Sequence, residues 1–272
     1  MESVLLAGII RMVKEMNIAE EILAKYDNLF EDLSKQGKGD LRFGRSLVSV
    51  SAISGQYYCE KKLEMGNDHP LPPSKRMIEG EAGHEAATSL AEPVLKEEGI
   101  ALAVKEREEA LPLFEFSIGW KHNNIPIIGR IDEAWFRGGN VDLVVERKFS
   151  DRLAVYRDHH LQAQLYCLGL GEMGFNTDST AYRIMLLKRS CRDCERLIER
   201  SCPIFSADKM GFYCYMGETK AFTYPFKKEE IVKDLDWALR FWQNKRKAIP
   251  TKNRAKCRVC EYAIICDSTL AK

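Results

Sequence analysis

The sequence lacks the long apolar run and the N-terminal signal that would direct it to a membrane or out of the cell. No apolar stretch approaches the ~20 residues that a transmembrane helix requires. The first 15 residues carry charges at Glu2, Arg11, Lys14 and Glu15, which is unlike the basic start and apolar core of a secretory signal. We therefore expect a cytoplasmic protein with no membrane partner.

The chain also lacks a surplus of charge of either sign. Its 41 basic and 40 acidic residues give a formal net charge of +1. A global positive field that would draw the protein to nucleic acid is thereby excluded, and any such binding must rest on local basic patches. With 272 residues, of which 45% are hydrophobic, the chain is long enough for one large domain or two small ones.

Cysteine, by contrast, is abundant, with nine residues. In a cytoplasmic protein disulfides are rare and clustered cysteines more often bind metal. A C-x-x-C pair fits zinc or an iron–sulfur cluster. Two clusters are evident, a C-terminal triplet of Cys257, Cys260 and Cys266 and a C-x2-C-x7-C-x11-C group of Cys191, Cys194, Cys202 and Cys214.

Hydrophobic periodicity predicts a chain that alternates between helices and strands. We expect two amphipathic helices within residues 2–35, broken near Asn17, and a loop over 67–74. Further helices are predicted over 75–95, 161–174 and 228–247. Strand-like runs occupy 100–121, 125–137, 141–149, 181–189 and 220–226, with turns at 122–124 and 138–140.

The residues that carry chemistry lie where two of these apolar runs end. Asp132 follows the run that begins at Ile125, and Glu146 with Lys148 follows the next. Side chains two apart on a strand point to the same face, so Glu146 and Lys148 lie side by side while Arg147 points away. Two carboxylates and an ammonium on adjacent strands are typical of a metal-dependent phosphodiesterase.

Two helices are expected to complete this site. Gln162 and Tyr166 are four residues apart and share one helix face, as do Gly80 and His84. A divalent ion that bridges a phosphate and an attacking water needs hard oxygen ligands and often one nitrogen. His84 could supply that nitrogen from its helix.

The predicted roles follow from these side-chain chemistries. The expected ligands of the ion are Asp132, Glu146, the backbone carbonyl of Arg147 and His84. Lys148 is placed to orient or deprotonate the water and to offset charge in the transition state. Gln162 and Tyr166 would hold the phosphate backbone or the lysine. A bare E-x-K pair is usually a solvated ion pair, and only the joint pattern favours catalysis.

Together, Gly129-x-x-Asp132, Glu146-x-Lys148 and Gln162-x-x-x-Tyr166 resemble the signature of the PD-(D/E)XK nucleases of the RecB type. Gly80-x-x-x-His84 resembles the upstream histidine motif of that group. The resemblance covers roughly residues 47–267. It implies an α/β fold, with a restriction-endonuclease-like central mixed β-sheet flanked by helices, and DNA cleavage that depends on Mg or Mn. The chain then divides into an N-terminal helical extension, 1–45, and a nuclease domain, 46–272.

Cys59 together with the C-terminal triplet resembles the iron–sulfur variant of this nuclease group. That variant includes the CRISPR-associated RecB-like nucleases, the exonuclease V family and helicase–nuclease subunits of the AddB kind. The resemblance implies an iron–sulfur cluster, 4Fe-4S in preference to 2Fe-2S, that joins the two chain ends beside the active site. Its ligands would be Cys59, Cys257, Cys260 and Cys266. Such a staple closes a loop of about 200 residues; zinc in the same four sites is the alternative.

The other cysteine group lies in an insertion, 190–218, and is not part of that signature. Its spacing permits a small zinc site. Incidental thiols in an insertion are the alternative interpretation.

A basic run near the C-terminus is the expected path for DNA. Eight basic residues and no acidic one occur between Arg240 and Arg258. Contact with phosphates is the natural use of such a run beside a nuclease site. We assign this role to Lys245, Arg246, Lys247, Lys252 and Arg254. The neighbouring Phe241 and Trp242 either stack on bases or belong to the core.

The resemblance favours exonuclease action on single-stranded DNA or DNA ends. The leading hypothesis is a CRISPR-associated nuclease that acts in spacer acquisition with integrase proteins as partners. An exonuclease V-like repair nuclease is the alternative within the same chemistry. Two other classes are a catalytically inactive DNA-binding scaffold subunit and a zinc-ribbon adaptor in which the E-x-K pair is accidental.

Overall fold

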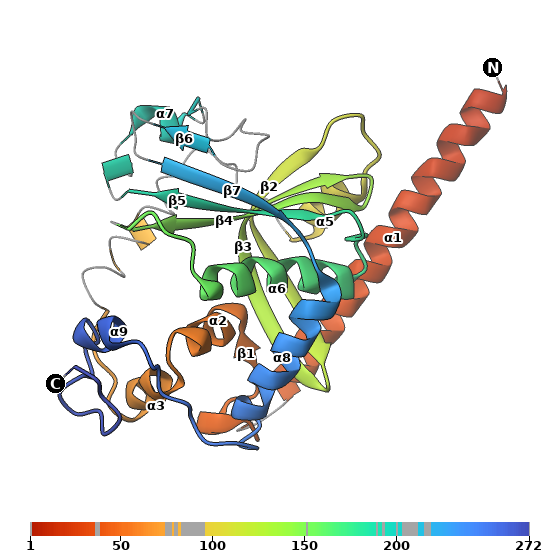
Figure 1. Cartoon of the computed structure of the whole chain (residues 1–272). Helices are drawn as coiled ribbons and strands as arrows, with labels where there is room; N and C mark the ends of the chain where they lie inside the picture. The colour runs from red at the N-terminus through yellow and green to blue at the C-terminus, as the bar shows by residue number, and fades with distance from the viewer. Residues whose placement is uncertain are drawn as a thin grey trace.

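In the computed structural model of the protein, one long strand, β3, pairs with three other strands. The model describes residues 2–35, 39–73, 78, 81–82, 96–150, 152–188, 190–191, 194–199, 201–202, 212–214 and 219–271. Its elements, labelled as in Figure 1, are α1 (Glu2–Lys35), η1 (Arg42–Gly44), β1 (Val48–Ser49), α2 (Val50–Tyr58), α3 (Glu60–Asp68), α5 (Lys96–Val104), β2 (Leu111–His122), β3 (Ile125–Arg137), β4 (Asn140–Phe149), α6 (Arg157–Met173), β5 (Ala181–Leu187), α7 (Glu195–Ile198), β6 (Phe212–Cys214), β7 (Thr219–Pro225), α8 (Lys228–Trp242) and α9 (Arg254–Arg258).

The sheet forks along β3. Strand β2 pairs antiparallel with nearly the whole of one edge of β3, from Ile125 to Phe136. The other edge is shared, because β1 pairs parallel at Ile127 and Ile128 while β4 pairs antiparallel over 133–137. Between these two pairings lies the stretch 129–132, where the described strands leave that edge open. The fork therefore creates an opening in the sheet at the residue that was predicted to be catalytic, Asp132.

Beyond the fork the sheet continues in the order β3-β4-β5-β7-β6. The β4–β5 pair is parallel, and the β5–β7 and β6–β7 pairs are antiparallel. A parallel pair needs a crossover connection, which α6 provides by packing on β2, β4 and β5. The expectation of an α/β fold with a mixed sheet flanked by helices is confirmed (Figure 1).

Alternation along β4 and β5 separates two apolar layers. Val144, Ile184 and Leu186 belong to the main core, which also contains buried residues of α6 and α8. Their neighbours Val145 and Met185 point the other way, into a smaller apolar cluster with residues of the segment after β5. Because Glu146 and Lys148 are in phase with Val144, they face α6.

Most of the predicted elements are confirmed, including both turns. Strand β2 ends at His122, and Asn123 and Asn124 take φ values of 48° and 62°, which is the left-handed geometry that a tight hairpin needs. The predicted helix is α6, and its apolar residues Leu161, Leu165 and Leu168 are buried.

The prediction of two N-terminal helices is wrong, because α1 is one helix of 34 residues (Figure 1). Asn17 is a weak helix breaker, with a penalty of at most about 0.7 kcal/mol. Burial of Ile22 and Leu29 against the rest of the chain outweighs that penalty. The predicted start of the strand at residue 100 is also wrong, since 100–104 belong to α5 and a short apolar run does not distinguish the two structures.

Cys59 lies between α2 and α3. Its backbone is extended, with φ −173° and ψ 115°, and it ends one helix and begins the next. Ser49 caps α2, since its side chain accepts a hydrogen bond from the Ala52 amide. The predicted helix over 75–95, with Gly80 and His84, lies almost wholly outside the described residues.

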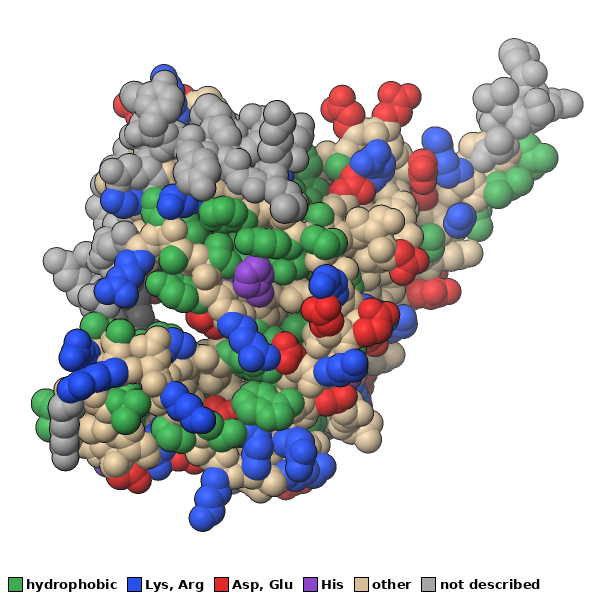
Figure 2. Space-filling view, viewed as in Figure 1, with side chains coloured by type: hydrophobic (Ala, Val, Ile, Leu, Met, Phe, Trp, Pro, Cys, Tyr) green, Lys and Arg blue, Asp and Glu red, His purple; other side chains and the backbone are tan. Residues whose placement is uncertain are grey.

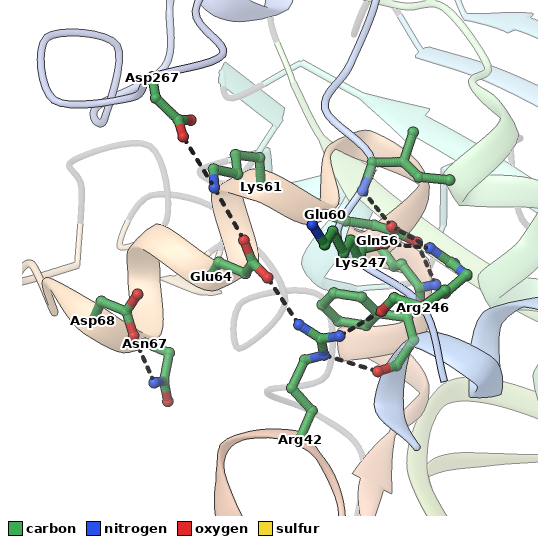
Figure 3. Close-up of polar contacts among 12 residues, drawn as sticks. Arg42, Gln56, Glu60, Lys61, Glu64, Asn67, Asp68, Arg246, Lys247 and Asp267 are labelled. Atoms are coloured by element: carbon green, nitrogen blue, oxygen red, sulfur yellow. Dashed lines mark hydrogen bonds and ion pairs between the residues drawn. The ribbon is translucent and has the colours of Figure 1, made fainter. Parts of the chain in front are cut away.

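A polar network ties the C-terminal segment to α2 and α3 (Figure 3). Glu60 is buried and accepts hydrogen bonds from Arg246, from Gln56 Nε2 (2.6 Å) and from the Ile249 amide (2.7 Å). Arg42 donates to the carbonyls of Phe241 (2.8 Å) and Arg246 (2.6 Å). The segment after α8 is therefore held against η1 and α3.

Candidate active site

A cleft of about 830 Å³ opens at the fork of the sheet. Its floor contains the five residues that the sequence predicted to be catalytic, which are Asp132, Glu146, Lys148, Gln162 and Tyr166. They come from β3, β4 and α6. The structure thus brings together three motifs that are separated in the chain.

Asp132 and Glu146 supply the carboxylates of this floor. Asp132 Oδ2 accepts a hydrogen bond from the Arg147 amide at 2.7 Å, which fixes its orientation across the open edge of β3. Glu146 is 1% exposed, and its Oε1 lies 2.6 Å from Lys148 Nζ. Both carboxylates are hard oxygen donors of the kind that Mg²⁺ and Mn²⁺ prefer.

Lys148 is held between a carboxylate and a carboxamide. Its Nζ donates to Gln162 Oε1 at 2.9 Å as well as contacting Glu146. Burial opposes the charge, but attraction to Glu146, and more weakly to Asp132, outweighs it and raises the pKa of the Lys148 ammonium. Lys148 is therefore a fixed cation at neutral pH in the absence of a metal ion.

Gln162 and Tyr166 form the second layer of the site. Gln162 Nε2 donates to the Tyr166 hydroxyl at 2.9 Å, and its Oε1 also accepts from Ser54 Oγ at 3.2 Å. Burial, with Glu146 and Asp132 nearby, raises the pKa of Tyr166, which stays protonated. A Cβ on Gly129 would lie 3.0 Å from Tyr166 Cε1, so glycine lets the ring close over β3.

The remaining predicted metal ligands are placed only in part. His84 lies outside the described residues. The Arg147 amide donates to Asp132, whereas the predicted role of the Arg147 carbonyl as a metal ligand stays a prediction. Within the described part of the chain, no group of three or more His, Cys, Asp or Glu side chains is arranged to hold a metal ion.

Glu115 is a cleft residue that the sequence analysis missed. It lies on β2 where the register passes from Phe114–Glu133 to Phe116–Ile131, so it faces Asp132 across the strand pair. Its φ of 52° is uncommon for a residue with a side chain. Glu115 pairs with Arg130 at 2.9 Å. No spacing motif marks it, because only the strand register brings it to Asp132.

The four cysteines of the predicted cluster line a second, small pocket of about 20 Å³. Cys59, Cys257, Cys260 and Cys266 are free thiols. The Thr251 amide donates to Cys59 Sγ at 3.4 Å, and burial raises the pKa of the Cys260 thiol. Cysteines far apart in the sequence thus line one pocket, although the pocket has room for about one water molecule.

The insertion cysteines have a different environment. Cys191 and Cys202 are buried in the small apolar cluster with Met185, Leu187 and Leu197, and Cys194 packs against it. Such packing is typical of cysteine as a small hydrophobe. The side chain of Cys214 lies outside what the structure describes, so the zinc site stays a prediction.

The predicted DNA-binding residues do not form one class. Lys245, Lys247, Lys252 and Arg254 are exposed. Figure 2 shows lysine and arginine side chains over the lower end of α8 and the C-terminal segment. Arg246, however, is engaged by Glu60 and stacks on Trp237, with its guanidinium carbon 4.0 Å from the ring centroid. Its role in the structure is internal.

Phe241 and Trp242 belong to the core rather than to a stacking surface. They are 0% and 1% exposed. Trp242 Nε1 donates to Gln56 Oε1 at 2.9 Å.

Comparisons with known proteins place the chain only loosely. No protein-family model matches it, and no curated protein matches it either. Among solved structures, it is similar to one described as "Crystal structure of SSO0001", with 15% identity and a TM-score of 0.44. That alignment covers 92% of this chain and 95% of the other. In the described part of the chain, the helices are all too short or too polar to cross a bilayer.

Proposed function

We propose that this protein is a metal-dependent deoxyribonuclease of the RecB-like PD-(D/E)XK type, with a restriction-endonuclease-like sheet. The observation that carries the proposal is the geometry of Lys148, whose Nζ lies between Glu146 Oε1 (2.6 Å) and Gln162 Oε1 (2.9 Å) in the cleft that also exposes Asp132. A bare ion pair on a strand edge would be solvated. Here Gln162 of α6 holds the Lys148 ammonium against Glu146, in the cleft that also contains Asp132.

The donor set fits Mg²⁺ or Mn²⁺. Asp132 and Glu146 would hold the ion from neighbouring strands, with the Arg147 carbonyl and His84 as the further ligands expected from the motifs. A bound ion supplies a Lewis acid for a phosphate oxygen and lowers the pKa of a water. Among the described residues of the cleft, Glu81, Glu115, Asp132 and Glu146 outnumber the two cations, Arg130 and Lys148. A divalent ion would offset this excess of negative charge when a phosphate enters.

The protein's own residues then act on the scissile phosphate. Lys148 places a positive charge where negative charge develops on the phosphate oxygens. Gln162 keeps the ammonium in position and is itself held by Tyr166 and Ser54. With the charge of Asp132 and Glu146 partly neutralised by an ion, the Lys148 ammonium would be attracted to them less strongly and would donate more readily to water or phosphate.

Single-stranded DNA or a DNA end is the proposed substrate, and exonuclease action the proposed mode. The support is the motif pattern together with the exposed basic residues after α8. Spacer acquisition in CRISPR immunity, with integrase proteins as partners, is the leading context, and exonuclease V-like repair the other. Genomic neighbours would separate the two.

Cleavage assays on paired variants test the catalytic proposal. End-labelled single-stranded DNA is incubated with Mn²⁺ or Mg²⁺ and the wild type, Asp132→Asn or Lys148→Ala. We expect each variant to lose about 10²- to 10³-fold in rate, the scale of removing one electrostatic stabiliser. Asp178→Asn and Lys233→Ala, at exposed positions outside the cleft, are the matched controls and should keep wild-type rates. A wild type that cleaves nothing with any divalent ion rejects the proposal.

We also propose that Cys59, Cys257, Cys260 and Cys266 hold an iron–sulfur cluster. Four thiols that line one pocket are the donor set of such a cluster, and the Thr251 amide already donates to one of them. The cluster would supply a cross-link between the segment after α2 and the C-terminus. Because the pocket is small, the thiols must move apart to admit it.

Metal analysis tests the cluster separately from catalysis. Anaerobically purified protein should contain iron and acid-labile sulfide and absorb broadly near ~400 nm. Cys260→Ser should lose most of the iron, whereas Cys167→Ser, at a buried cysteine of α6 away from the pocket, should keep it. Colourless protein whose stoichiometric zinc is lost in Cys260→Ser would assign zinc to this pocket instead.

A further inference from the structure

Two aromatic side chains of α1 line the same cleft as the candidate catalytic residues. Tyr26 and Phe30 lie one helical turn apart, with ring centroids 4.6 Å from each other and planes at 33°. Both belong to the wall of the cleft whose floor holds Asp132 and Lys148. They come from the N-terminal extension, which none of the nuclease motifs includes.

Helix α1 holds these rings in a defined position. Ile22 and Leu29 are 1% and 4% exposed, so this part of the helix is packed on the body of the protein. A Cβ on Gly119 of β2 would lie 2.7 Å from a methyl group of Leu29, and this glycine lets α1 approach the sheet closely. Tyr26 lines the cleft together with Ser117, which lies on the same strand as Gly119.

Phe30 is only partly covered by the rest of the chain. Its side chain is 37% exposed, although Leu29 beside it is buried. An apolar ring left partly exposed in the cleft that also contains Asp132 and Lys148 offers a flat surface within the site of proposed phosphate chemistry. Every nucleobase has a π-face that can stack on such a ring, but in a duplex that face is already stacked.

We propose that Phe30, supported by Tyr26, is a stacking platform for an unpaired base of the DNA strand beside the scissile phosphate. The inference rests on the proposed nuclease function and specifies its substrate as single-stranded or frayed DNA. The N-terminal extension is then a part of the substrate site. The platform distinguishes single-stranded from double-stranded DNA but not one base sequence from another, because every base can stack on an aromatic ring.

Binding measurements test the platform without turnover. Fluorescence anisotropy is recorded with a labelled single-stranded oligonucleotide and with the matching duplex, in Ca²⁺, which takes oxygen ligands like those of Mg²⁺. Phe30→Ala should weaken single-strand binding about 5- to 150-fold, the range of one lost base stack, and leave blunt-duplex binding unchanged. Phe30→Tyr should keep wild-type affinity.

A scan with one abasic nucleotide at successive positions adds a readout that a structural role would not produce. The wild type should lose affinity when the abasic nucleotide occupies one particular position, and Phe30→Ala should lose that position dependence. Met16→Ala is the matched control on the same helix, at a residue 53% exposed and outside the cleft. Equal loss in Met16→Ala, a flat wild-type scan, or unchanged binding by Phe30→Ala overturns the platform.

These outcomes are distinguishable from failure of the proposed function. A wild type that binds with a position-dependent scan but cleaves no DNA rejects catalysis and keeps the platform. A wild type that cleaves, with Phe30→Ala equal to it in binding and in KM, rejects the platform and keeps catalysis.

Discussion

Neighbouring residues of β4 have different roles because successive side chains lie on opposite faces of the sheet. Glu146 and Lys148 face α6 and the cleft, whereas Arg147 is wholly buried on the other side, where it pairs with Glu133. Its guanidinium carbon lies 5.8 Å from the centroid of the Phe114 ring. One strand therefore carries both the proposed chemistry and a buried ion pair that supports it.

Removing one partner of this buried pair should destabilise the fold strongly. Glu133→Ala leaves the Arg147 charge buried without its carboxylate and also removes the acceptor of Trp135 Nε1 (2.6 Å). We expect a loss of about 3–5 kcal/mol in the free energy of unfolding, measured by urea denaturation. Asp142→Ala, which breaks the exposed Arg137–Asp142 pair, is the control and should unfold like the wild type. Equal effects of the two changes would contradict the assignment.

His159 should make stability depend on pH. Burial, reinforced by nearby Lys148, lowers the pKa of His159 to about 4, although Asp158 acts in the opposite direction. The unfolded chain, with a His pKa near 6.5, therefore takes up the proton first as the pH falls. The contribution of His159 to the free energy of unfolding is constant above pH ~6.5, and it falls as the pH is lowered from there toward ~4. Urea titrations at pH 7 and pH 5 should show a smaller decrease in the free energy of unfolding for His159→Gln than for the wild type. Equal decreases would contradict a buried neutral histidine.

At the scale of elements, α6 and α2 both reach β3 at a single glycine of the cleft, Gly129. Tyr166 and Val50 both approach Gly129, which lies at the open edge of the fork. Gly129 is thus the position where α2, α6 and the sheet meet. A side chain there must displace one of them.

Gly129→Ala should therefore disturb both stability and the site. The added Cβ would lie 3.0 Å from Tyr166 Cε1 and 3.0 Å from Val50 Cγ2. Overpacking of this kind typically costs about 1–3 kcal/mol. Thermal unfolding should show a lower midpoint, and a shift of Tyr166 should loosen Gln162 and reduce cleavage. Gly8→Ala on α1, with nothing within 4 Å, should instead be neutral or stabilising; a tolerated alanine at 129 would show that the contact is not tight.

For the whole molecule, the decisive feature is that segments far apart in the sequence meet. The segment after α8 returns to α2 and α3, where Glu60 and Arg42 hold it (Figure 3). The same return brings the C-terminal cysteines to Cys59. The polar network and the cysteine pocket therefore secure the same junction.

Glu60→Ala should release that junction. The change removes the carboxylate that Arg246 and the Ile249 amide contact in a buried setting, so we expect a loss of about 3–5 kcal/mol. Limited proteolysis should then cut within residues 243–256, and iron content should fall because Cys59 loses its position relative to the triplet. Asp267→Asn, which weakens the 3.5 Å contact with Lys61 at the surface, is the control and should resist protease like the wild type. An intact C-terminus in Glu60→Ala would contradict this account.

The sequence by itself determined the elements that local patterns encode. Alternation in β4 correctly placed Glu146 and Lys148 on one face and Arg147 on the other. Helical spacing correctly placed Gln162 with Tyr166. Both follow from the fixed periods of strand and helix, which need no knowledge of the rest of the chain.

Only the tertiary structure decided which distant surfaces meet. The continuity of α1, the buried engagement of Arg246, and Glu115 opposite Asp132 depend on packing and strand register, which no local period contains. The place of Tyr26 and Phe30 in the cleft has the same origin. Local spacing fixes the direction of a side chain within its element, but the free energy that joins elements comes from burial between segments far apart in the chain, and it is this burial that made an N-terminal helix part of the site.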